Sequence, residues 1–168
     1  MTGKHGKAVC IGFCPTYKTH GELATLHRSV DSVELVQTAL EEQCGFVRLR
    51  TYAGAEVTAE CIVKSVTELA LGVQSGTLVL IQFCGHGVKF RGKSCMIADD
   101  GAIVPARLLA SIVAEQVTDR HLTDVQLVLV FDCCRLDDDD DTAHAAAGAP
   151  SVAGGMRVCW ALQRNTCC

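Results

Sequence analysis

Four short apolar runs, rich in β-branched residues and separated by helical patterns, constrain the fold of this chain more than any other feature. The runs span residues 7–13, 46–52, 77–83 and 125–131. The last two are almost continuously apolar, which is typical of central strands in a sheet that is covered on both faces. The second run alternates apolar residues with Arg48 and Arg50, a pattern that favours a strand near an edge of the sheet.

Apolar residues at helical spacing lie between these runs. In the first such segment, the residues expected to face the core are Val33, Val36 and Leu40. Gly45 is the expected stop of this helix. Thr58 can cap a second helix, and Pro105 suits the first turn of a third.

The order strand, helix, strand at this spacing predicts right-handed crossovers and a mostly parallel sheet. Residues 88–98 are too few for a crossover and are expected to form a small β-excursion. Residues 136–155 hold few large apolar side chains, so a mobile surface loop is predicted there. A fifth strand is predicted at Met156–Gln163. With 168 residues, the chain is expected to be one α/β domain over residues 1–168, a three-layer α/β/α sandwich.

Composition and charge exclude several classes of function. The 15 basic and 19 acidic residues give a net charge of −4, which provides no basic field for nucleic acid. No apolar run approaches the roughly 18 residues of a membrane helix, and the first residues carry no secretory signal pattern. The 11 cysteines are odd in number and lack zinc-ligand spacing, so neither a disulfide framework nor a metal site is predicted. A reduced, cytoplasmic protein without nucleic-acid or membrane partners is the expectation.

The two central runs are followed by segments that carry reactive side chains. These segments read Cys84-Gly85-His86-Gly87 and Asp132-Cys133-Cys134-Arg135. Because the carboxyl ends of parallel strands meet at one edge of a sheet, His86 and Cys134 are expected to face one another. An imidazole can take the thiol proton, which creates the thiolate that attacks an amide, and can later protonate the leaving amine. Glycines on both sides of His86 would leave N–H groups available to an oxyanion.

The pairing of LIQFCGHG with LVLVFDCCR resembles the caspase clan of cysteine peptidases, which includes caspases, paracaspases and metacaspases. The resemblance covers about residues 7–163 in order and spacing, and it implies a caspase-like, p20-type catalytic domain. It implies that His86 is the catalytic histidine and Cys134 the nucleophile. The N–H groups of Gly87 and Cys134 would form the oxyanion hole. Cys133 is the alternative nucleophile, although the family pattern selects the second cysteine.

The same resemblance bears on specificity. Caspases cut after Asp and recognise it with arginines, whereas metacaspases and paracaspases cut after Arg or Lys and use acidic residues. Asp31 falls on the acid that opens the first helix of a metacaspase, and Asp132 on the acid two residues before the nucleophile. Two carboxylates suit a guanidinium through forked, charge-assisted hydrogen bonds. The expected activity is a Cys-His endopeptidase that cleaves protein or peptide substrates after Arg or Lys.

Two other functions stay open. One is an Asp-specific, caspase-type peptidase, because Arg28 lies near Asp31 and residues 137–155 offer five aspartates but no Lys or Arg for self-processing. The other is a catalytically silent, caspase-like interaction module or a large-subunit fragment. In that case self-association or a further chain would complete the pocket, because the family continues with another strand and further substrate-binding loops.

No cofactor is expected. The acidic run Asp137–Asp141 could in principle bind Ca²⁺, which takes six to eight oxygen ligands. Consecutive aspartates do not match the spacing of a calcium loop, so a solvated acidic run is the preferred interpretation. Calcium stays the alternative.

Overall fold

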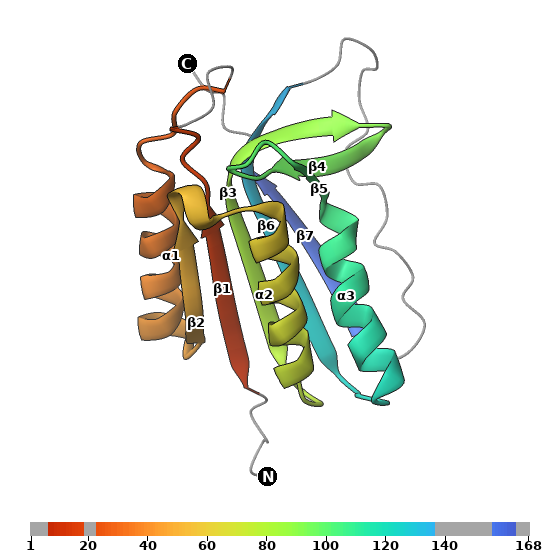
Figure 1. Cartoon of the computed structure of the whole chain (residues 1–168). Coiled ribbons are helices and arrows are strands. Elements are labelled where there is room, and N and C mark those ends of the chain that lie inside the picture. The colour runs from red at the N-terminus through yellow and green to blue at the C-terminus, as the bar shows by residue number, and fades with distance from the viewer. Residues whose placement is uncertain (1–6, 19–22, 137–155, 164–168) are drawn as a thin grey trace.

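The computed structural model of the chain describes residues 7–18, 23–136 and 156–163, which form one seven-stranded sheet with helices on both faces (Figure 1). The elements in chain order are β1 (Ala8–Cys14), α1 (Ser29–Cys44), β2 (Val47–Ala53), the 3₁₀ turn η1 (Gly54–Glu56), α2 (Ala59–Gly72), β3 (Leu78–Phe90), β4 (Lys93–Ile97), β5 (Ile103–Pro105), α3 (Ala106–Asp119), β6 (Val125–Leu136) and β7 (Met156–Gln163). The predicted α/β/α sandwich and the predicted fifth long strand are both confirmed.

The sheet is mostly parallel, as predicted. Strands β2, β1, β3, β6 and β7 lie side by side in that order and run in the same direction. Strand β2 is at the edge, as its alternating pattern indicated. The predicted β-excursion is a hairpin in which β4 pairs antiparallel with the end of β3, through a turn at Arg91 and Gly92. The three-residue strand β5, which the sequence analysis did not predict, pairs with β4.

Both central strands are longer than the sequence predicted. Strand β3 continues to Phe90 instead of ending at Phe83, and β6 continues to Leu136 instead of ending at Phe131. The apolar pattern stops earlier than the backbone pairing, because the two strands stay in register from Leu78 to Val88. The segments that carry the reactive side chains therefore belong to the sheet and not to loops beyond it.

The larger apolar core lies between the sheet and helices α2 and α3, which pack together on one face (Figure 1). The residues that the two central strands contribute to it are Val79, Ile81, Phe83, Val125, Leu127, Leu129 and Phe131. Burial of a side chain of this size stabilises the folded state by about 1.5–3 kcal/mol. Because successive side chains of a strand point to opposite faces, these residues all lie on the same face of the sheet.

Helix α1 covers the other face with a smaller cluster of Cys14, Val33 and Cys84. Val33 is fully buried, as predicted, but Val36 is exposed, so its assignment to the core is wrong. The buried stripe of α1 consists of Ser29, Val33 and Gln37 at four-residue spacing. Two of these three are polar, so apolar spacing alone marks only Val33 of the buried stripe.

The predicted helix ends are close to those observed. Gly45 ends α1 in the left-handed conformation at φ 70°. Thr58 caps α2, where its Oγ1 accepts a hydrogen bond from the Cys61 N–H at 3.1 Å. Pro105 is the residue just before α3 and not part of its first turn. The predicted loop at residues 136–155 lies outside the described residues except for Leu136, which ends β6.

Candidate active site

The structure places His86 and Cys134 directly opposite each other on the two central strands. Their Cα atoms are register partners in the parallel ladder between β3 and β6. The ladder runs without a shift from the first pair, Leu78 with Gln126. Neighbouring strands lie about 4.8 Å apart, and residues opposite each other in a parallel pair share a face of the sheet. An unbroken register of two buried strands therefore fixes the spacing of this pair.

The imidazole of His86 is held by contacts on several sides. Its Nε2 lies 2.7 Å from the backbone oxygen of Ala24, in the segment before α1. A carbonyl oxygen can only accept, so Nε2 carries the proton, and in the neutral ring Nδ1 keeps a lone pair. The His86 side chain is half-buried, and its ring packs against that of Tyr17 with centroids 4.5 Å apart. Nδ1 is thus the ring atom that can receive a proton.

The glycine before the histidine is required by close packing. A Cβ atom at Gly85 would lie 2.7 Å from both the Phe83 Cζ and the Tyr17 hydroxyl oxygen. Tyr17 and Phe83 are fully buried, so neither can easily move away. The sequence analysis related this glycine only to an N–H group for an oxyanion, and the structure adds a packing role.

The glycine after the histidine lies inside the sheet. Gly87 is buried, with Arg135 of β6 opposite it on one side and Met96 of β4 on the other. The prediction that the strand ends before Gly87 is therefore wrong. It follows His86 at the point where β3 acquires its second partner strand.

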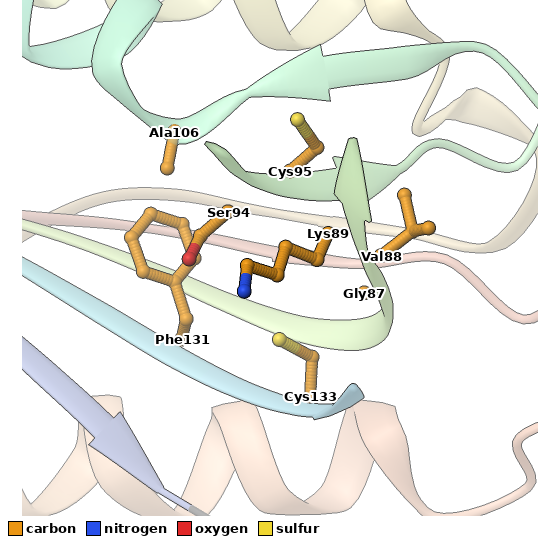
Figure 2. Close-up of a pocket in the computed structure, with 8 residues that line it drawn as sticks. All are labelled: Gly87, Val88, Lys89, Ser94, Cys95, Ala106, Phe131 and Cys133. Atoms are coloured by element: carbon orange, nitrogen blue, oxygen red, sulfur yellow. The ribbon is translucent and has the colours of Figure 1, made fainter. Parts of the chain in front are cut away.

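The alternative nucleophile, Cys133, belongs to the opposite face of the sheet. Successive strand residues alternate between faces, so Cys133 lies on the same face as Phe131, that of α2 and α3. His86 and its register partner Cys134 lie on the α1 face. Cys133 packs against the larger apolar core and lines a small pocket with Lys89, Cys95 and Phe131 (Figure 2). This placement favours Cys134 over Cys133 as the partner of His86.

The two acidic residues predicted to bind substrate both lie on the α1 side of the sheet. Asp31 is exposed in the first turn of α1. Asp132 is half-buried in β6, where its Oδ2 accepts a hydrogen bond from the Cys84 thiol at 3.8 Å. Burial, with the Asp132 carboxylate as the next cause, raises the pKa of Cys84 to about 12. Cys84 is therefore a neutral donor to Asp132 and not a nucleophile.

Two further predictions concern ions and membranes. Within the described ranges, no group of three or more His, Cys, Asp or Glu residues could hold a metal ion. The acidic run Asp137–Asp141 lies outside those ranges. In the part of the chain that the structure describes, no helix is both long and apolar enough to span a membrane.

Tyr17 is a residue at this site that the sequence analysis missed. It follows β1 by three positions, and its hydroxyl contacts the backbone of His86. A single tyrosine after a strand carries no pattern that would have distinguished it from an ordinary surface residue. Only the structure brings it to the histidine.

An α/β/α sandwich that sets a histidine opposite a cysteine on its two central strands has the architecture of caspase-like domains. The family model described as the caspase domain matches residues 5–159 of the chain. The chain therefore belongs to the caspase-domain family.

Two solved structures have a similar fold at low sequence identity. Protein GSU0716 from Geobacter sulfurreducens superposes with a TM-score of 0.60 at 16% identity, covering 76% of this chain and 50% of that one. The structure of pro-sf-caspase-1 gives a TM-score of 0.61 at 12% identity, covering 93% of this chain and 60% of that one. The chain thus spans half to three-fifths of the length of these neighbours. No curated protein sequence matches the chain significantly.

Proposed function

We propose that the chain is the catalytic domain of a cysteine endopeptidase in which Cys134 is the nucleophile and His86 the general base. The observation that carries the proposal is the register pairing of His86 with Cys134 on the two central strands. The bond from Nε2 to the Ala24 oxygen adds to it, because it leaves Nδ1 to exchange protons. Membership of the caspase-domain family supports the same reaction class.

The proposed reaction has two halves. The His86 Nδ1 takes the proton of the Cys134 thiol, and the thiolate attacks the scissile carbonyl carbon to form a C–S bond. The N–H groups of Gly87 and Cys134 are the proposed donors to the resulting oxyanion. The C–N bond then breaks, and the imidazolium returns its proton to the leaving amine. Water, deprotonated by His86, hydrolyses the thioester and regenerates the thiol.

The proposed substrates are polypeptides with Arg or Lys before the cut. Asp31 and Asp132 support this choice through their negative charge: Asp132 lies on the face of the sheet that α1 covers, and Asp31 is exposed in the first turn of α1. A guanidinium between two carboxylates gains charge-assisted hydrogen bonds. Arg28, exposed at the start of α1, is the feature that an Asp-specific enzyme would use instead.

A fluorogenic peptide panel with Arg, Lys or Asp before the cut, with and without Ca²⁺, tests this function. Cleavage after Arg or Lys should disappear in Cys134→Ala. It should persist in Cys133→Ala, the matched variant one residue away on the opposite face. Asp31→Asn and Asp132→Asn should raise KM for Arg substrates more than they lower kcat.

Three results would change the conclusion. Cleavage after Asp would retain the Cys134 nucleophile and overturn the acidic pocket. If Cys133→Ala loses activity and Cys134→Ala retains it, Cys133 is the nucleophile and not Cys134. An absence of turnover, together with slow and unselective alkylation of Cys134 by a thiol-directed peptidyl inhibitor, would indicate a silent interaction module.

A further inference from the structure

We propose that Tyr17 is the positioning residue of this site, holding the His86 imidazole in the orientation that leaves Nδ1 for Cys134. The inference rests on the proposed function, because it assigns Tyr17 a role in a reaction that His86 performs. It adds a residue from the loop after β1 to a pair formed by β3 and β6.

The Tyr17 hydroxyl joins two strands through hydrogen bonds with fixed direction. It donates to the backbone oxygen of Ile97 at 2.6 Å, since that oxygen can only accept. Its own oxygen then accepts the backbone N–H of His86 at 2.8 Å. The backbone of His86 is therefore tied to β4 through one buried phenol.

The ring of Tyr17 restricts the side chain of His86 as well. The two ring centroids are 4.5 Å apart with planes tilted by 47°, a close aromatic contact. A second restraint comes from the Nε2 bond to the Ala24 oxygen. Rotation of the imidazole away from its observed orientation would break that bond and separate the two rings.

Tyr17 is itself rigidly placed. Its backbone is left-handed at φ 56°, which is unfavourable for a residue with a bulky side chain. The N–H groups of Thr16 and Tyr17 both donate to the Asp99 Oδ1, at 2.8 and 2.6 Å. Asp99 is only 4% exposed, and its own N–H donates to the Val57 oxygen at 2.8 Å. A buried carboxylate thus holds the turn that presents the phenol.

The surroundings also keep the phenol protonated. Tyr17 is fully buried, and burial raises its pKa above the ordinary value, with Asp99 contributing in the same direction. The hydroxyl therefore stays a donor to Ile97 and an acceptor for His86 over the working pH range. The missing side chain at Gly85 leaves the space that the hydroxyl occupies.

The substitution Tyr17→Phe tests the role, since it removes one oxygen and keeps the ring. We expect kcat to fall by about 10- to 100-fold with KM little changed, because the substrate contacts are retained. The pH profile of Cys134 alkylation should change as well. The chain has one other tyrosine, Tyr52, whose ring stacks on Phe13, so Tyr52→Phe is a matched control that keeps wild-type kcat.

A readout that needs no turnover separates this inference from the proposed function. In NMR spectra of the full chain, Tyr17→Phe should shift the His86 amide and imidazole signals and speed exchange of that amide, and Tyr52→Phe should not. Wild-type kcat or unchanged His86 signals in Tyr17→Phe would overturn the positioning role. If the wild-type chain shows no turnover while Tyr17→Phe shifts the signals, the proposed function fails, and the catalytic role of the contact fails with it.

A second variant covers the case in which Tyr17→Phe does not fold. Asp99→Asn keeps an oxygen that can accept from Thr16 and Tyr17 but removes the charge that strengthens both hydrogen bonds. A smaller fall in kcat, in the same direction and with the same shifts of the His86 signals, would support the inference. Wild-type kcat and unchanged His86 signals in Asp99→Asn would count against it.

Discussion

The two faces of the central sheet differ in chemistry, although the same strands form both. On the face of α2 and α3, strand β3 presents Val79, Ile81 and Phe83 to a continuous apolar core. On the α1 face, the same strand presents Leu80, Gln82 and Cys84, followed by His86. The α1 face is also where Cys84 contacts Asp132. Alternation along one strand thus separates the groups that hold the fold from those that we propose perform the chemistry.

This separation has an energetic reason. Polar groups on a buried face lose solvation, and each needs a partner or a shifted pKa. The thiols of Cys14 and Cys84 show this, because burial raises the pKa of each to about 12. Concentrating such groups on one face of the central strands leaves the other face to supply apolar side chains to the larger core.

The largest expected difference between the two faces is in the free energy lost when a buried leucine is shortened to alanine. Leu129→Ala, at a fully buried site on the α2 and α3 face, should lower the free energy of unfolding by about 3–5 kcal/mol. Leu80→Ala makes the same change on the α1 face of the neighbouring strand, at 8% exposure and outside both apolar clusters. We expect it to cost about 2 kcal/mol or less. Urea denaturation measures both, and equal losses would contradict a difference between the faces.

The next largest effect is expected at Gly85, which packs against Phe83 of the apolar core and Tyr17 of the candidate site. Gly85→Ala would force a methyl group against Phe83 and Tyr17, both fully buried, and should destabilise the fold by about 1–3 kcal/mol. Its displacement of the phenol should also reduce peptidase activity. Gly72→Ala, at the end of α2 where nothing lies within 4 Å of the new Cβ, is the control and should be neutral or stabilising. A fully active Gly85→Ala would argue against the packing role.

The fold was largely predictable because its signals are local. Apolar runs gave five strands, and helical spacing with Gly45 and Thr58 gave the helix ends. The extensions of β3 and β6 were not predictable from apolarity, since backbone pairing continues through polar residues once two strands are in register. Val36 was misassigned because α1 contacts the sheet through polar Ser29 and Gln37.

The candidate site was predictable in part for a similar reason. His86 and Cys134 each follow the last large apolar residue of a run by the same number of positions, so the sequence predicts that they pair. Tyr17 and Asp99 lie 82 residues apart and meet only through the fold. Their separation in the sequence matches no helix or strand period that would predict a contact. The contact also depends on the left-handed conformation of Tyr17, where the sequence has no glycine to indicate a turn.

The two buried thiols on the α1 face, Cys14 and Cys84, should make the free energy of unfolding depend on pH in the alkaline range. The folded pKa of Cys14 and of Cys84 is raised from 9.0 to about 12, so their contribution to stability is complete below pH 9. Above pH 9 the unfolded chain releases these protons and the native chain does not, so stability falls as pH rises toward 12. Each thiol should contribute up to about 1.4 kcal/mol per pH unit to that slope.

Urea denaturation at pH 8 and pH 10 measures this slope. Cys14→Ala and Cys84→Ala should each flatten it. Val33→Ala removes a side chain of the same cluster without an ionisable group, so it should lower stability equally at both pH values. An unchanged slope in both cysteine variants would show that neither thiol is protected from ionisation in the native chain.

The smallest effect concerns a buried amide on the α1 face. Gln82 is 3% exposed, and its Oε1 has no hydrogen-bond partner among the described residues. Gln82→Met keeps the length of the side chain and removes the amide with its unpaired oxygen, so stability should change by less than about 1 kcal/mol and in the stabilising direction. Gln37 also has one buried amide atom without a partner among the described residues, its Nε2, but its Oε1 accepts the Thr51 hydroxyl at 2.7 Å. Gln37→Met would leave that hydroxyl unpaired and should therefore destabilise the fold. If Gln82→Met costs 2 kcal/mol or more, the Gln82 amide makes favourable hydrogen bonds in the folded chain, to ordered water or to protein, and its oxygen is not an unpaired acceptor.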